Sequence, residues 1–182
     1  MKMKKKQCMT SVSVRLMSIL ILQKIKAFFG QRVKKNMTII DGVIVTPLNI
    51  VNVNEGNVLH GIKSTDNGFK GFGEAYFSTI EFGKVKAWKR HRMMTLNLIV
   101  PIGEISFVIH DDRVGSITSG MFQNIKLSKQ NYARLTIPPM LWLGFQGVGN
   151  EENILLNIAN IEHNPEEADK KNLDDFIYDW RL

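Results

Sequence analysis

Hydrophobic and polar positions alternate, or gather in short apolar runs, along most of the chain after residue 38. The runs are as long as β-strands and rich in Ile, Val, Leu and aromatic residues. A period of two is typical of strands that bury one face. The pattern predicts strands within residues 38–48, 57–63, 73–80, 85–91, 95–101, 104–112, 132–139 and 154–161.

Residues that favour turns separate these runs. Examples are Asp66-Asn67-Gly68, Gly83, Gly103 and Pro138-Pro139. Regular short strands with turn signals between them predict a β-sandwich or barrel. Only the acidic stretch 164–173, NPEEADKKNL, has a helical composition, and we expect a helix there.

The last apolar segment, IYDW at 177–180, follows that stretch. We expect it to fold back over the mouth of the barrel or against a second copy of the chain.

Charge divides the chain into two parts. Residues 1–36 hold ten of the 24 Lys and Arg residues and no Asp or Glu, which leaves fourteen basic residues against all seventeen acidic ones in the remainder. The remainder is therefore mildly acidic, and we expect it to bind no nucleic acid. The sequence predicts an N-terminal extension, residues 1–36, and one domain, residues 38–182.

The extension has an apolar run, Leu16 to Leu22, that is too short and too close to charges for a transmembrane helix. A basic amphipathic helix is predicted instead, with Leu16, Leu20 and Ile25 or Phe28 on one face. Three interpretations remain open: weak contact with an anionic membrane surface, a targeting segment, or no function.

Cysteine and histidine positions bear on location and metal binding. Cys8 is the single cysteine, so the chain can form no internal disulfide, which fits a reducing compartment such as the cytoplasm. The four histidines, His60, His91, His110 and His163, do not have the spacing of a metal-ligand cluster. We expect no metal and no other cofactor.

Residues 83–103, GKVKAWKRHRMMTLNLIVPIG, resemble the metal-binding strand pair of small double-stranded β-barrels, the cupins. Gly83, His91 and Gly103 stand at the expected positions, whereas Lys89 and Leu96 replace the first His and the Glu ligand. The resemblance implies that the chain keeps the strand pairing and the turn of a cupin without its metal ligands.

Residues 111–145 are similar to the dTDP-4-dehydrorhamnose 3,5-epimerases, which share the motifs Asp-x-Arg-x-x-Ser-x-Thr-x-Gly, Leu-Ser-x-x-Asn and Leu-x-Ile-Pro. The matching residues are Asp111, Arg113, Ser116, Thr118, Gly120, Leu127, Ser128, Asn131, Leu135, Ile137, Pro138, Gly144 and Phe145. Shorter matches are FGE at 72–74 and HNPEE at 163–167. The resemblance covers about residues 38–182 and implies an all-β jelly-roll barrel (a double-stranded β-helix). It also implies a homodimer acting, without metal, on a nucleotide-linked 4-keto sugar.

Epimerisation next to a ketone removes the α-carbon proton and returns one on the other face, so it needs a base, an acid and a donor to the enolate oxygen. The resemblance places the base His of the family at Lys89, its acid Tyr at Asn157 and a further His at Leu143. Because side chains alternate along a strand, Lys89 and His91 share a face, which we expect to line the cavity. Lys89 and His91 are therefore base candidates, and Asn157 a donor.

Substrate contacts are predicted for eight further residues. Lys86 replaces a family Arg that contacts the diphosphate, and Tyr76 is a candidate substitute for the missing acid. A structural role is the alternative for each, such as Arg113 closing a turn. The eight are Lys86, Phe72, Glu74, Tyr76, Asn97, Arg113, Trp142 and Phe145.

Three functions remain open. One is 3,5-epimerisation of a nucleoside-diphospho-4-keto-6-deoxy sugar in surface polysaccharide biosynthesis. Another is 3,4-ketoisomerisation, because IPPMLW at 137–142 matches the PPxxW of the sugar ketoisomerases. Those enzymes have a pair of His residues at the positions that Lys89 and His91 occupy in this chain. The third is a barrel that binds a sugar nucleotide without turnover.

Overall fold

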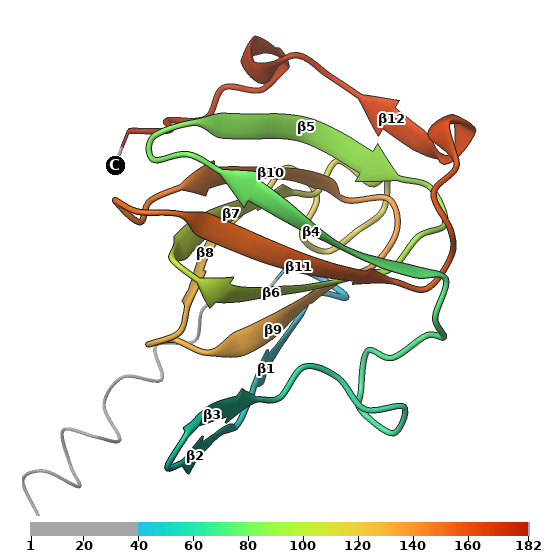
Figure 1. Ribbon diagram of the computed structural model, residues 1–182. Coiled ribbons are helices and arrows are strands. Elements are labelled where there is room, and N and C mark those ends of the chain that lie inside the picture. Colours follow the sequence, from blue (N-terminus) through green and yellow to red (C-terminus); the bar gives the residue numbers. More distant parts are fainter. Residues whose placement is uncertain (1–39, 182) are drawn as a thin grey trace, which may run out of the picture. The chain divides into compact units, whose positions relative to one another are not determined.

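The computed structural model of the protein describes residues 40–181. This part folds into two five-stranded antiparallel sheets that face each other, with a separate two-stranded hairpin (Figure 1). The strand orders are β1-β9-β6-β11-β4 in the first sheet and β12-β5-β10-β7-β8 in the second. The predicted all-β jelly-roll barrel is confirmed.

The elements have the following bounds. The strands of the first sheet are β1 (Ile44–Pro47), β4 (Glu74–Ile80), β6 (Leu96–Ile102), β9 (Ala133–Ile137) and β11 (Asn153–Ala159). Those of the second sheet are β5 (Val85–His91), β7 (Glu104–His110), β8 (Phe122–Ser128), β10 (Trp142–Gly147) and β12 (Ala168–Lys170). The hairpin is β2 (Ile50–Val53) with β3 (Gly56–Leu59), and two short 3-10 turns are η1 (Pro165–Glu167) and η2 (Leu173–Asp175).

Each of the eight segments expected to contain a strand overlaps one, and β2, β8, β10 and β12 were not predicted. The missed β8 has a clear period of two, because Gln123, Ile125 and Leu127 are buried while Asn124 and Lys126 are exposed. β10 lacks such a signal because it contains two glycines, which are uncommon inside strands.

The helix predicted for residues 164–173 is wrong. Pro165 to Glu167 form only one 3-10 turn, capped by the Asn164 side chain, and Ala168–Lys170 then pair with β5 as an edge strand. β12 lies along the outer side of β5 in Figure 1. Pairing with an open sheet edge satisfies backbone groups that a short polar helix would leave to water, which favours the strand here.

The hydrophobic core lies between the two sheets. Leu98 of β6, Leu135 of β9 and Leu155 of β11 pack in one buried cluster with Phe107 of β7. Gly103 makes the turn between β6 and β7 with a φ of 76°, and a Cβ there would lie 2.5 Å from the Glu152 carbonyl oxygen. Glycine is therefore required at this turn, as the cupin spacing implied.

The expectations for residues 1–36, including Cys8, the amphipathic helix and its membrane contact, fall outside the described residues. Within residues 40–181 there is no helix with the length and apolar character needed to cross a bilayer.

Candidate functional site

A pocket of about 480 Å³ opens between the two sheets. The first sheet contributes Tyr76, Ser78, Leu96, Leu98, Leu155 and Asn157 to its wall. The second sheet contributes mainly Lys86, Lys89, His91, Leu143 and Phe145, and the C-terminal segment adds Lys170 and Lys171. Apolar walls with a few convergent polar groups are usual for small-molecule sites of this size.

A β-bulge in β5 sets which of its side chains reach the pocket. Leu143 of β10 pairs with Lys89, but Phe145, two residues on, pairs with Lys86, so β5 has one extra residue in this interval. A bulge reverses the alternation of side chains beyond it. Lys86, Lys89 and His91 all line the pocket as a result.

His91 and Glu167 form a buried pair at one wall of the pocket. Nδ1 of His91 lies 2.5 Å from Oε2 of Glu167, and the exposed fractions of the two side chains are 8% and 1%. The backbone amides of Met93 and Met94 donate to the other carboxylate oxygen, at 2.7 and 2.8 Å. Glu167 therefore holds the proton of His91 on Nδ1 and leaves Nε2 able to accept one.

The surroundings of the pair favour an ionised carboxylate beside a neutral imidazole. Burial lowers the pKa of His91 by more than the hydrogen bond to Glu167 raises it. Burial also raises the pKa of Glu167, but the bonds from Met93, His91 and Met94 outweigh this and bring it below its usual value. A neutral imidazole held by a carboxylate is suited to general-base catalysis near neutral pH.

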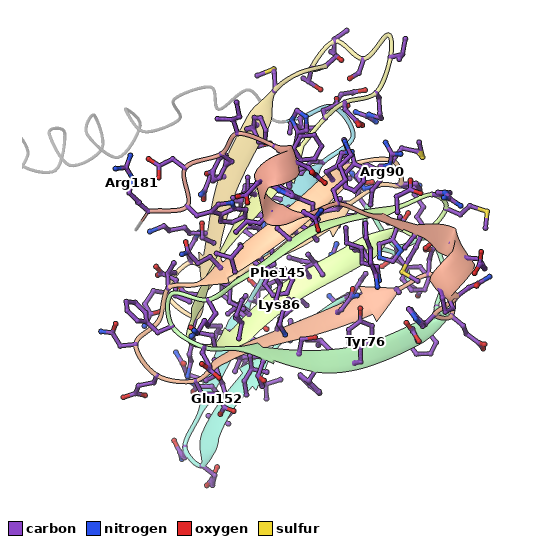
Figure 2. The ribbon with its side chains drawn as sticks, turned by 90° about the horizontal axis from the view of Figure 1, so that it is seen from above. Tyr76, Lys86, Arg90, Phe145, Glu152 and Arg181 are labelled. Atoms are coloured by element: carbon purple, nitrogen blue, oxygen red, sulfur yellow. The ribbon has the colours of Figure 1, made fainter. Side chains whose placement is uncertain are left out.

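Lys89 is half-buried beside His91. Burial and the charge of Lys170 lower the pKa of the Lys89 ammonium, while Glu167 and Glu74 act in the opposite direction. Its neighbour Lys86 donates from Nζ to the Thr79 carbonyl at 2.8 Å. Figure 2 shows Lys86 next to Phe145, whose ring centroid lies 6.0 Å from Nζ.

A second polar pair lies on the opposite wall. Nδ2 of Asn157, on β11, donates to the Tyr76 hydroxyl, on β4, at 2.8 Å. Asn157 is buried, and its Oδ1 has no hydrogen-bond partner within residues 40–181. Buried polar atoms usually have partners, so a bound molecule is one source of the missing hydrogen bond. The Tyr76 hydroxyl is fixed by Asn157 and faces the same pocket as His91.

Five of the predicted contact residues lie elsewhere. Trp142 points to the outer face of the second sheet, where its Nε1 donates to Asp112 at 2.7 Å and its ring lies under the Arg90 guanidinium. Asn97 is buried in the first sheet, bonded to Thr136. Both predictions of substrate contact are corrected, because strand alternation and the sheet interior direct these side chains away from the pocket.

Arg113 is also outside the pocket. It donates to both carboxylate oxygens of the buried Asp111, at 2.9 Å each, and to the Asp41 carbonyl. Ser116 and Thr118 donate to the same carboxylate at 2.6 Å. The motif best matched to the epimerases therefore closes a turn around Asp111, which was the structural alternative.

Phe72 and Glu74 do not line the pocket. Phe72 precedes β4 and is 66% exposed. Glu74 begins β4 and pairs with Ala159 at the end of β11, so it influences Lys89 through its charge rather than through the pocket wall. The FGE motif thus marks the entry to the edge strand of the first sheet.

The sequence-based predictions missed Glu167, Lys170 and Lys171. The HNPEE match contains Glu167, but an expected solvated helix concealed its role. Pairing of β12 with β5 brings this segment to the site, because Ala168 pairs with His91 and Lys170 with Lys89. Lys171 exchanges backbone hydrogen bonds with Trp88, at 3.1 Å each.

The segment that follows packs on the outer face of the second sheet. The rings of Phe176 and Trp180 lie 5.4 and 5.3 Å from that of Trp88. The Tyr178 hydroxyl accepts from Nδ2 of Asn124 at 3.0 Å. The expectation that IYDW folds back is right, but it covers the outer side of β5 and β10 rather than the mouth of the barrel.

A jelly-roll barrel with a polar pocket between its sheets defines a cupin-like protein. Its chain is 35% identical to a dTDP sugar isomerase of Desulfovibrio desulfuricans G20, whose solved structure matches with a TM-score of 0.75 over 78% of this chain and 92% of that one. We therefore assign the chain to the dTDP-4-dehydrorhamnose 3,5-epimerase-like (RmlC-like) family of sugar-nucleotide epimerases and isomerases.

Two curated proteins are also similar. The chain is 32% identical over 100 residues to the probable low-salt glycan biosynthesis epimerase Agl13 of Haloferax volcanii, a match that covers 54% of this chain and 64% of that protein. It is 25% identical over 134 residues to the spore coat polysaccharide biosynthesis protein SpsL of Bacillus subtilis, covering 74% of this chain and 89% of SpsL. No protein-family model matches the chain.

Proposed function

We propose that the protein epimerises a nucleoside-diphospho-4-keto-6-deoxy sugar at the carbons next to the ketone, in the biosynthesis of a surface polysaccharide. The observation that carries this proposal is the placement of two proton-handling pairs on opposite sheets. His91 with Glu167 belongs to the β5 side of the pocket, and Tyr76 with Asn157 to the β4–β11 side. A flat enolate between them would meet a base on one face and a hydroxyl on the other.

The proton transfers follow from this arrangement. Nε2 of His91 takes the α-proton, and Glu167 stabilises the imidazolium that forms. The Tyr76 hydroxyl, oriented by Asn157, returns a proton to the opposite face, and the configuration inverts. Negative charge that develops on the ketone oxygen needs a cation or donor nearby, and Lys89, on the wall with His91, is placed to supply it.

The charge of the pocket supports an anionic substrate. Lys86, Lys89 and Lys170 line it, and among the described residues none of the three has a carboxylate within salt-bridge distance. Lys171 also borders it, but its Nζ lies over the Trp142 and Phe176 rings on the outer face of the sheet. Uncompensated positive charge in a concave site attracts anions and raises their association rate. A diphosphate bound by Lys86 at the pocket wall would leave the sugar among the deeper residues.

Incubation with dTDP-4-keto-6-deoxyglucose in deuterated water tests the proposal. We expect solvent deuterium at C3 and C5 and an epimerised product. A protein that binds the nucleotide sugar but incorporates no deuterium would refute the epimerase and leave a binding module.

Deuterium at C3 alone, with migration of the keto group, would indicate a 3,4-ketoisomerase instead. Two observations favour this second candidate: the His91 position two residues after Lys89, and the similarity to a protein described as a dTDP sugar isomerase. A homodimer and a cytoplasmic location stay predictions from the sequence.

A further inference from the structure

Lys89 and Lys170 are direct cross-strand partners. They pair between β5 and β12, and both line the pocket. Like charges directly opposite each other in an antiparallel pair destabilise the sheet. Neither lysine has a salt bridge within residues 40–181, so the repulsion is not relieved by a carboxylate in contact.

The charged groups around Lys89 come from four elements. Lys170 faces it from β12, Glu167 from η1, Glu74 from β4, and His91 lies two residues further along β5. Burial and Lys170 lower the pKa of Lys89, and the two carboxylates only partly oppose them. Desolvation and a neighbouring cation are the two ways in which proteins make a lysine amine nucleophilic at neutral pH.

From the position of Lys89 in the pocket wall, beside His91 and opposite Lys170, we infer that its amine forms a covalent imine with the C4 ketone of the substrate. The inference rests on the proposed function, since it requires a ketone in this pocket. It replaces an electrostatic contact between Lys89 and the enolate oxygen with a C–N bond.

The steps balance without any further reactant. The neutral amine of Lys89 attacks C4, and the resulting carbinolamine loses water to give a protonated imine. Nε2 of His91 then removes the proton from C3 or C5, and the C–H electron pair moves to form an enamine, which is neutral at nitrogen. Reprotonation of that carbon on the face of Tyr76 restores the iminium, and water adds to C4 to release the ketone and the amine.

Lys170 is assigned a tuning role in this scheme. Its charge disfavours protonation of Lys89 and so increases the amine available for attack. It need not touch the substrate ketone, because its effect passes through Lys89. The readout that distinguishes this role from a merely structural one is the pH dependence of adduct formation.

Reductive trapping tests the inference. The full-length protein is incubated with dTDP-4-keto-6-deoxyglucose and sodium cyanoborohydride, which reduces iminium ions in preference to ketones. We expect an intact-mass gain of one substrate less one water plus two hydrogens, and peptide mapping should place the label on Lys89. Lys89→Arg should abolish the adduct, because a guanidinium does not form an imine, whereas Lys84→Arg, on an exposed loop lysine, should retain it.

The outcomes separate the inference from the proposed function. If the wild-type protein exchanges deuterium but forms no adduct, the imine is overturned and the epimerase is left intact. Full deuterium exchange in the Lys89→Arg variant would lead to the same conclusion. An adduct on Lys89 without exchange would support the imine and remove the epimerase. An adduct on Lys86, Lys170 or Lys171 in place of Lys89 would overturn the assignment.

A variant of the partner lysine gives an independent readout. Lys170→Gln should raise the pH at which trapping is half-maximal and slow it at pH 7 by roughly ten-fold for each unit of that shift. Lys171→Gln, at the next position, serves as the matched control for the loss of one positive charge. Equal shifts in both variants would contradict a specific effect of Lys170 on Lys89.

Discussion

His91 and Glu167 are 76 residues apart in the sequence and in direct contact in the fold, with 2.5 Å between Nδ1 and Oε2. The contact exists because β12 adds to the edge of β5 immediately after Glu167. The 3-10 turn that precedes β12 directs the Glu167 side chain inward, where it also caps the amides of Met93 and Met94. A C-terminal segment that looks solvent-exposed in the sequence thus completes the site.

Glu167→Gln should lower kcat by roughly 10²-fold, within the range that positioned acid–base groups contribute. The amide can still accept from Met93 and Met94, so folding should be largely preserved, but it no longer compensates the imidazolium of His91. Steady-state kinetics with circular dichroism as the folding check measure this. Wild-type kcat in a folded Glu167→Gln protein would contradict a catalytic role for the pair.

The pH profile of kcat/KM should have its acid limb below the ordinary His pKa of about 6.5. Activity requires neutral His91, whose pKa is lowered by burial, so activity is present above that lowered pKa and is lost as the pH falls through it. Because Glu167 raises the pKa of His91, Glu167→Gln should move the limb to still lower pH. An acid limb above pH 6.5, or an upward shift of the limb in Glu167→Gln, would contradict this prediction.

Arg113→Gln should affect stability rather than turnover. The variant loses the charge-assisted bonds to Asp111, so the free energy of unfolding at pH 7 should fall by about 1–2 kcal/mol. The pKa of Asp111 is held far below its ordinary value, first by Arg113 and also by Ser116 and Thr118. Its stabilisation is therefore present above about pH 4 and fades below it, so the deficit of the variant should shrink in acid.

Urea unfolding at several pH values, with kcat/KM measured in parallel, checks this. A loss of more than about ten-fold in kcat/KM (1.4 kcal/mol) without loss of stability would return Arg113 to the substrate contacts.

Gly144→Ala should destabilise the fold, because a Cβ there would lie 2.7 Å from the Ala87 methyl and 2.8 Å from the Trp180 ring. Overpacking of this kind costs about 1–3 kcal/mol. If the clash with Trp180 dominates, the double variant Gly144→Ala with Trp180→Leu should lose less stability than the two single losses predict. Thermal unfolding measures it, and strict additivity would show that the clash with the Ala87 methyl dominates instead.

The sequence was sufficient for the barrel because period-two patterns and turn residues are local signals. It also predicts that Lys89 and His91 share one face, because the alternation of side chains is a property of a single strand. The family resemblance predicts a substrate contact for Lys86, but its placement beside them depends on the β-bulge in β5, which arises from pairing with β10 and leaves no local signature.

The longer-range parts of the site could not be predicted in the same way. Glu167 and Lys170 reach the pocket only because an edge strand forms where the composition favoured a helix. Arg113 shows the reverse case. It belongs to a well-matched motif for which substrate contact is one prediction, but its guanidinium donates to Asp111, at 2.9 Å, within a tight turn. Motif matches identify the family more securely than they assign roles.

The central claim is that protons are removed and returned by different sheets, and Tyr76→Phe tests it most directly. With dTDP-4-keto-6-deoxyglucose in deuterated water, the Tyr76→Phe protein should still exchange the α-proton through His91 while losing inversion at that carbon. His91→Asn should lose both. Inversion at the wild-type rate in Tyr76→Phe, or exchange at the wild-type rate in His91→Asn, would contradict the account.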